Sequence, residues 1–86
     1  MKLYVGNLPF SHNDFALEDL FSPFGEVSSA QVIIDHHSGR SRGFGFVEMV
    51  NSQEAQKAQQ ALNGCTVEGR DLVVNEARQD KKRSRP

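Results

Sequence analysis

The sequence predicts a small α+β fold in which a four-stranded antiparallel sheet carries two helices on one face. Six segments follow one another in the order strand, helix, strand, strand, helix, strand. The strands show alternation of apolar side chains and the helices show helical spacing, with turn-forming residues between them. This βαββαβ order is the split βαβ, or ferredoxin-like, arrangement. Two right-handed βαβ units then interleave, so the first and third strands are central and both helices cover the same face.

Length and composition indicate one ordinary globular domain. The chain has 86 residues, of which 37% are hydrophobic and 24% charged. It lacks a run of about 20 apolar residues, the length that a membrane helix needs. A strand-like pattern begins directly after Met1, so no signal peptide is expected. The single Cys65 excludes an internal disulfide and a cysteine-cluster zinc site. We expect a monomer in the cytoplasm, or in the nucleus if the source is eukaryotic.

The strands are predicted from runs of alternating and β-branched residues. Counting alternation from Val32 turns Ala30 toward the core. Gln31 and Ile33 then point to the opposite face. In the same way Val73 and Asn75 point outward while their neighbours point inward. The strands are expected at Lys2–Asn7, Val27–Asp35, Arg42–Met49 and Leu72–Asn75, with a short hairpin turning at Glu68-Gly69 before the last one.

The first helix is predicted between a capping residue and a proline. Asn13 is its N-cap, and Asp14 places a negative charge in the first turn. Pro23 and Gly25 end it. Phe15 lies off the apolar stripe, where it either packs over the helix edge or contacts a protein. The stripe itself consists of Leu17, Leu20 and Phe21.

The second helix begins at Asn51, where Glu54 three residues later resembles a capping box. It ends at Asn63-Gly64. Ala55 and Ala58 are small enough to let this helix lie close to the sheet, and Leu62 continues their stripe.

The third strand carries the main functional signal, the octamer Arg42-Gly43-Phe44-Gly45-Phe46-Val47-Glu48-Met49. Alternation puts its two phenylalanines on one face and its smaller apolar residues on the core face. The hexamer Leu3-Tyr4-Val5-Gly6-Asn7-Leu8 puts Tyr4 on the same face as those rings if the two strands are neighbours. Exposed apolar patches tend to mark binding sites. Flat rings in a row suit the stacking of unpaired bases.

These two segments resemble the two motifs of the RNA recognition motif family. The octamer matches the family pattern K/R-G-F/Y-G/A-F-V-x-F/Y, except that Met49 replaces the last aromatic residue on the core-facing side. The hexamer is similar to the family's second motif. The resemblance covers roughly residues 2–78. In style the chain is similar to small free-standing proteins of the family, namely the bacterial, glycine-rich and cold-inducible ones.

The resemblance implies binding of a few unpaired nucleotides of RNA, or of single-stranded DNA, without catalysis or a cofactor. Tyr4 and Phe44 would each stack a base, and Phe46 would pack against the sugars between them. Arg42 would contact a phosphate, and Arg40 in the preceding turn is placed to do the same. The positions that match the rim, where base choice is tuned, are Lys2, Gln31, Ile33, Val73, Asn75 and Arg78.

Charge is divided unevenly along the chain. Residues 1–77 hold five Lys or Arg against ten Asp or Glu, whereas residues 78–86 hold five against one. The domain, residues 1–78, is therefore acidic and lacks the basic footprint usual in nucleic-acid binders. The tail, residues 79–86, is strongly polar, and we expect it to be disordered when free. It would serve as a solubilising end, as a phosphate-contacting arm, or as both.

Other interpretations stay open. A further element could cover the rings and make them part of a core, but the tail is too polar for that. Some relatives of the fold bind a peptide, usually after losing the exposed aromatic residues. An enzyme is least favoured, because no nucleophile beside a base and no phosphate-binding glycine loop is visible. The adjacent His36 and His37 lack companion metal ligands. Single-stranded RNA binding, in RNA chaperoning or post-transcriptional regulation, is the favoured function.

Overall fold

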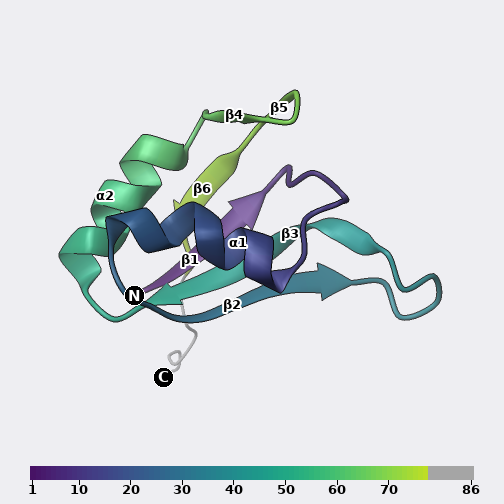
Figure 1. Cartoon of the computed structure of the whole chain (residues 1–86), viewed down its shortest axis with the longest axis horizontal. Helices are drawn as coiled ribbons and strands as arrows, with labels where there is room; N and C mark the ends of the chain where they lie inside the picture. The colour runs from purple at the N-terminus through teal and green to yellow at the C-terminus, as the bar shows by residue number, and fades with distance from the viewer. Residues whose placement is uncertain (78–86) are drawn as a thin grey trace, which may run out of the picture.

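The structure is a computed structural model and describes residues 1–77. Four of its strands form an antiparallel sheet, two more form a small hairpin, and two α-helices lie on one face of the sheet (Figure 1). In chain order the elements are β1 (Lys2–Gly6), α1 (Asp14–Phe21), the 3-10 helix η1 (Ser22–Phe24), β2 (Val27–Ile34), β3 (Ser41–Met49), α2 (Ser52–Leu62), β4 (Thr66–Val67), β5 (Arg70–Asp71) and β6 (Val73–Glu76).

The strand order in the sheet is β2-β3-β1-β6, so β1 and β3 are central and the predicted fold is confirmed. Strands β4 and β5 form the hairpin between α2 and β6. None of the helices described is long and apolar enough to cross a membrane. The predicted tail, residues 79–86, and the predicted rim residue Arg78 lie outside the described residues.

The local signals in the sequence place the helix starts and the hairpin turn. Asn13 Oδ1 accepts a hydrogen bond of 2.9 Å from the Ala16 amide, and Asn51 Oδ1 accepts one of 3.0 Å from the Glu54 amide. Both satisfy amides that a helix start leaves without partners. The hairpin turns through Glu68 and Gly69 with φ of 50° and 82°, as a type I′ turn requires.

Five predicted strand ends differ from the structure by one residue each, and for Leu72 the hydrogen bonds give the reason. Leu72 was expected in the last strand, but β6 begins at Val73. The Leu72 amide donates to the Cys65 carbonyl at 2.9 Å, and the Leu72 carbonyl accepts from Gly64 at 2.7 Å. Both backbone groups of Leu72 are thus used to close the hairpin. Its side chain is nevertheless buried, as predicted.

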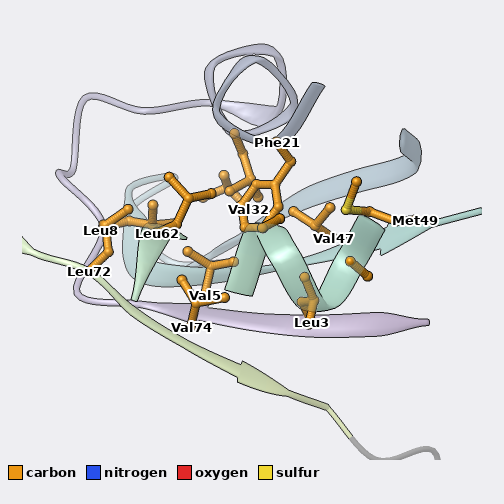
Figure 2. Packing of buried hydrophobic residues seen from close by; sticks show 13 residues of the cluster. Leu3, Val5, Leu8, Phe21, Val32, Val47, Met49, Leu62, Leu72 and Val74 are labelled. Carbon is orange, nitrogen blue, oxygen red and sulfur yellow. The ribbon is translucent and has the colours of Figure 1, made fainter. Parts of the chain in front are cut away.

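The core lies between the sheet and the helices (Figure 2). Gly45 allows α1 to lie close to β3, because an added Cβ would be 3.0 Å from Leu17 Cδ2 and 2.5 Å from the Gln31 carbonyl oxygen. Met49 is buried, as expected from its position in the octamer, whereas Ala30 is only half-buried. The buried residues are Leu3, Val5, Leu8, Leu17, Phe21, Val32, Val47, Met49, Ala55, Ala58, Leu62, Leu72 and Val74.

Strand β3 departs from regular pairing where it enters the sheet. Val32 pairs with Gly45 and Ile34 pairs with Ser41, so a step of two residues in β2 spans four in β3. Gly43 lies at this irregularity with φ of 84°, a conformation that glycine adopts without strain. The Gly43 carbonyl accepts a hydrogen bond of 2.8 Å from the Leu8 amide. The loop after β1 is thereby attached to the start of β3.

Candidate nucleic-acid interface

Three aromatic rings lie side by side on the face of the sheet opposite the helices. Tyr4 of β1 pairs with Phe46 of β3, and Phe44 pairs with Gly6. The Tyr4 ring centroid is 5.9 Å from those of Phe44 and Phe46, and the two phenylalanine centroids are 6.2 Å apart. These separations are typical of interacting aromatic pairs. We call Tyr4, Phe44 and Phe46 the aromatic platform; the structure brings together all three rings that the sequence predicted.

The Tyr4 ring occupies space that is free only because Gly6 has no side chain. A Cβ added at Gly6 would lie 2.6 Å from Tyr4 Oη and 2.9 Å from a carbon of the ring. The Tyr4 side chain therefore leans along its own strand, over the backbone of Gly6 and toward Phe44. The alternation pattern did not predict this role for Gly6, although glycine in the middle of a strand is a known sign of close approach.

The platform is half-buried, whereas the sequence predicted exposed rings. The rings shield one another, as their spacing of about 6 Å implies. Both α-helices pack on the opposite face, where their buried residues join those of β1 and β3 in one core. Within residues 1–77 no helix covers the platform (Figure 1). The rings thus contact one another at their edges, and neither α-helix lies over them.

The predicted rim residues extend the platform across the sheet. Pairing places Gln31, Phe46, Tyr4 and Asn75 in one row, with one residue from each of the four strands. Gln31 and Asn75 are exposed, so amide groups stand at both ends of the row. Val73 pairs with Gly6 and has 41% of its surface exposed. Ile33 is half-buried next to Val32, and alternation puts it on the platform side.

Two cations flank the platform. Lys2 Nζ lies 4.9 Å from the Phe46 ring centroid, and Arg42 Cζ lies 6.0 Å from that of Phe44. Such distances allow a cation–π interaction. Within residues 1–77 neither cation lies within 4.0 Å of a carboxylate, although the exposed Glu48 pairs with Lys2 across β1 and β3 on the same face. The platform therefore combines apolar flat surface with positive charge.

Four of the five basic residues among residues 1–77 lie at the platform or beside a groove next to it. Lys2 and Arg42 flank the platform, and Arg40 lines a groove of about 950 Å³ beside it. Arg70 lies 4.7 Å from the ring centroid of Phe10, which lines the same groove. Lys57, the fifth, is on α2. Residues 1–77 are acidic in total, but four of their five basic residues lie at the platform or beside this groove.

Among residues 1–77 no group of three or more His, Cys, Asp or Glu is arranged to hold a metal ion. His36 and His37 lie in the exposed turn between β2 and β3. The side chains at the platform offer stacking, charge attraction and hydrogen bonding by amide groups.

Known proteins are similar to this chain in sequence and in fold. The family model of the RNA recognition motif matches residues 3–73. The chain is 54% identical over 76 residues to a 29 kDa chloroplastic ribonucleoprotein of Arabidopsis thaliana. The aligned residues cover 88% of this chain and 22% of that protein. This chain spans about a quarter of the length of the curated relatives that it matches.

Solved structures agree with the sequence comparison. The crystal structure of RNA Binding Protein PG1 has a TM-score of 0.87 at 43% identity, covering 100% of this chain and 98% of the other. A structure of the Sex-lethal protein in complex with RNA has a TM-score of 0.85 at 33% identity, covering 91% of this chain and 47% of the other.

The relatives correct two expectations and confirm a third. The predicted cytoplasmic location is wrong, because relatives from Arabidopsis thaliana, Nicotiana sylvestris and Spinacia oleracea are named as chloroplastic. The composition of a domain does not encode its compartment. The likeness to bacterial proteins is not supported either, since these relatives are from plants. The family itself is confirmed by a match over most of the chain: this protein belongs to the RNA recognition motif family.

Proposed function

We propose that this domain binds single-stranded RNA as a monomer, by stacking unpaired bases on the aromatic platform, without catalysis or a cofactor. The observation that carries the proposal is the platform itself, with rings 5.9 to 6.2 Å apart and cations at its edges. Aromatic side chains on a sheet stack bases that are not held in a duplex. The RNA complex of the Sex-lethal protein, which has the same fold, supports this assignment.

Each part of the surface has a role in this proposal. Tyr4 and Phe44 each stack a base, and Phe46 packs against the sugars between them. Lys2 and Arg42 bind phosphates at the edges of the platform. The remaining site residues choose bases or add contacts: the amides of Gln31 and Asn75 donate to and accept from base edges, Ile33 and Val73 supply apolar surface, and Arg40 and Arg78 add positive charge.

The charge distribution favours unpaired RNA over nonspecific duplex binding. Residues 1–77 carry twice as many acidic as basic side chains, which opposes general attraction to a phosphate backbone. Stacking must therefore supply much of the affinity, and stacking on the platform requires bases that are free of a duplex. A domain of 1–78 with a basic tail at 79–86 suits contact with the bases and phosphates of unpaired RNA. This fits a role in RNA chaperoning or post-transcriptional regulation.

Replacing a platform ring tests the proposal. Phe44→Ala should weaken binding to a random pool of short single-stranded RNA by about 1–3 kcal/mol, the usual worth of a base stacked on an aromatic ring. Phe46→Ala should also weaken it, because the ring that packs against the sugars is lost. Fluorescence anisotropy measures the affinity, and urea unfolding checks that each variant is folded.

Phe15→Ala is the matched control, because this ring on α1 is 77% exposed and lies outside the platform. Its affinity should equal that of the unchanged protein. If both platform variants also bind as tightly as the unchanged protein, the platform is not the binding site. The same titration with DNA of identical sequence decides whether the 2′-hydroxyl contributes.

A further inference from the structure

The most exposed apolar side chains of the domain gather beside the start of α1. Within residues 1–77 five large apolar side chains are at least 41% exposed. Three of the five line one groove of about 350 Å³, namely Phe10, Phe15 and Ile34. Phe15 is the most exposed of all, at 77%. A cluster of exposed apolar side chains on a small domain tends to mark a binding surface.

The groove lies where α1 begins, next to the end of β2 (Figure 1). Asp14 joins the two elements there, because its Oδ1 accepts a hydrogen bond of 2.7 Å from the Val32 amide. Phe15 belongs to α1 and Ile34 to β2. The two exposed apolar side chains thus stand on elements that are already held together, and a ligand would meet a surface that is formed in advance.

Negative charge surrounds the Phe15 ring. Glu18 and Asp19 follow it by three and four residues in α1, so they lie on the same side of the helix. Both are exposed, and α1 contains no Lys or Arg. No Lys or Arg of the described chain lies within 4.0 Å of their carboxylates. The groove therefore has an apolar centre and an acidic margin that no described cation neutralises.

This charge decides which ligands fit the groove. RNA and anionic lipid surfaces are negative, so the carboxylates would repel them. A second copy of the chain that docked through the same groove would bring two acidic helices together. The chain's own residues 78–86 are basic, but they include no large apolar side chain. A polypeptide segment with both apolar and basic side chains matches both features.

We propose that this groove docks a basic and apolar segment of a partner protein. Apolar side chains of the segment pack on Phe15 and Ile34, and its Lys or Arg side chains pair with Glu18 and Asp19. An arginine also stacks flat on an aromatic ring such as that of Phe15. The inference goes beyond RNA binding and does not rest on it, because no residue of the aromatic platform lines the groove. A partner protein and RNA can therefore bind the same domain together.

Peptide display tests this docking site. A library of random peptides of about 12 residues, long enough when extended to cross the groove, is selected on the full chain, and the selected peptides are titrated by fluorescence anisotropy. We expect them to combine Lys or Arg with large apolar residues. Phe15→Ala should weaken their binding by about 30-fold, the effect of losing an aromatic hot spot. The fold should survive, since the ring is exposed and alanine favours a helix.

Charge variants separate a docking contact from general attraction. Glu18→Gln and Asp19→Asn should each weaken binding of the selected peptides by up to about 5-fold, the effect of one exposed ion pair. Glu26→Gln is the matched control, because this exposed residue precedes β2 at the end of the strand far from Ile34. It removes the same charge and should leave peptide affinity unchanged. Equal losses in all three variants would mean that overall charge attracts the peptides, and the docking site would be refuted.

Further outcomes would assign the groove differently. Selected peptides that are acidic, or that bind Phe15→Ala normally, would refute the docking site, as would a library that yields no binder. Displacement of the peptides by single-stranded RNA would assign the groove to RNA. Tighter peptide binding after deletion of residues 78–86 would assign it to the chain's own tail. A Phe44→Ala protein that loses RNA but keeps the peptides would confirm two separate sites, whereas loss of the peptides would place their contact on the platform.

Discussion

The two faces of the sheet are made from alternate residues of the same strands, yet they do different things. Leu3 and Val5 in β1 are both 0% exposed under the helices (Figure 2). Tyr4 between them is half-buried on the other face, among rings and cations. One face gains stability by removing aliphatic surface from water. The other keeps flat surface available for a ligand.

This division shows how strictly the strand register serves both tasks. Val5 pairs with Gly45 on one side and Val74 on the other, which are core positions in neighbouring strands. A slip of one residue would exchange the faces, burying Tyr4 and exposing Leu3. The buried face therefore specifies the position of the platform, although it takes no part in the proposed binding. Stability and binding should consequently respond to different residues of the same strand.

The largest expected effect separates two adjacent residues. Leu3→Ala should lower the free energy of unfolding by about 2–5 kcal/mol, as for other fully buried leucines, while the folded protein keeps its RNA affinity. Tyr4→Ala should lower the free energy of unfolding by about 0.5–1.5 kcal/mol for each lost ring pair, and it should also weaken RNA binding. Urea unfolding and RNA titration of both variants measure the two quantities. If Leu3→Ala weakened RNA binding by the folded protein as much as Tyr4→Ala does, the two faces would not have separate tasks.

A smaller effect is expected from glycines on opposite faces. Gly6→Ala should displace the Tyr4 ring and reduce RNA affinity by up to about 1–3 kcal/mol, with a minor loss of stability because a side chain can move aside. Gly45→Ala is its counterpart on the core face, where the added Cβ would meet the Gln31 carbonyl and Leu17. It should lower stability and leave affinity of the folded protein intact. A Gly6→Ala protein that binds RNA normally would mean that the position of the Tyr4 ring is unimportant.

Local sequence patterns were sufficient to predict the elements and the platform. The caps at Asn13 and Asn51 depend on residues three positions apart. The facing of Phe44 and Phe46 follows from alternation alone. These features are encoded within a few residues, so a single sequence reveals them.

Other features of the site depend on contacts between distant segments. Phe10 is fixed by Arg70, and Asn7 by the Asp71 carbonyl, across about sixty residues of chain. The irregular pairing at Gly43 interrupts the alternation from which the faces were predicted. The charge total likewise counts residues without regard to their position on the surface. The contacts of Phe10 and Asn7 have no local signal in the sequence, whereas the glycine at position 43 is the one local sign of the irregular pairing.

The smallest expected effect concerns where positive charge lies. Arg42→Gln removes a cation beside the platform, so fewer counterions should be released on binding. The slope of log affinity against log salt should then become less steep by about 0.7 for single-stranded RNA. Titrations at several salt concentrations measure this slope.

Lys57→Gln changes the formal net charge by the same amount, but Lys57 is an exposed residue of α2. For Lys57→Gln the slope of log affinity against log salt should match that of the unchanged protein, because counterions are released only where a phosphate is bound. Equal changes in both variants would mean that overall charge governs the attraction of RNA and that the gathering of cations beside the rings has no effect. A change confined to Arg42→Gln would place the phosphate path along the edge of the platform where Arg42 lies.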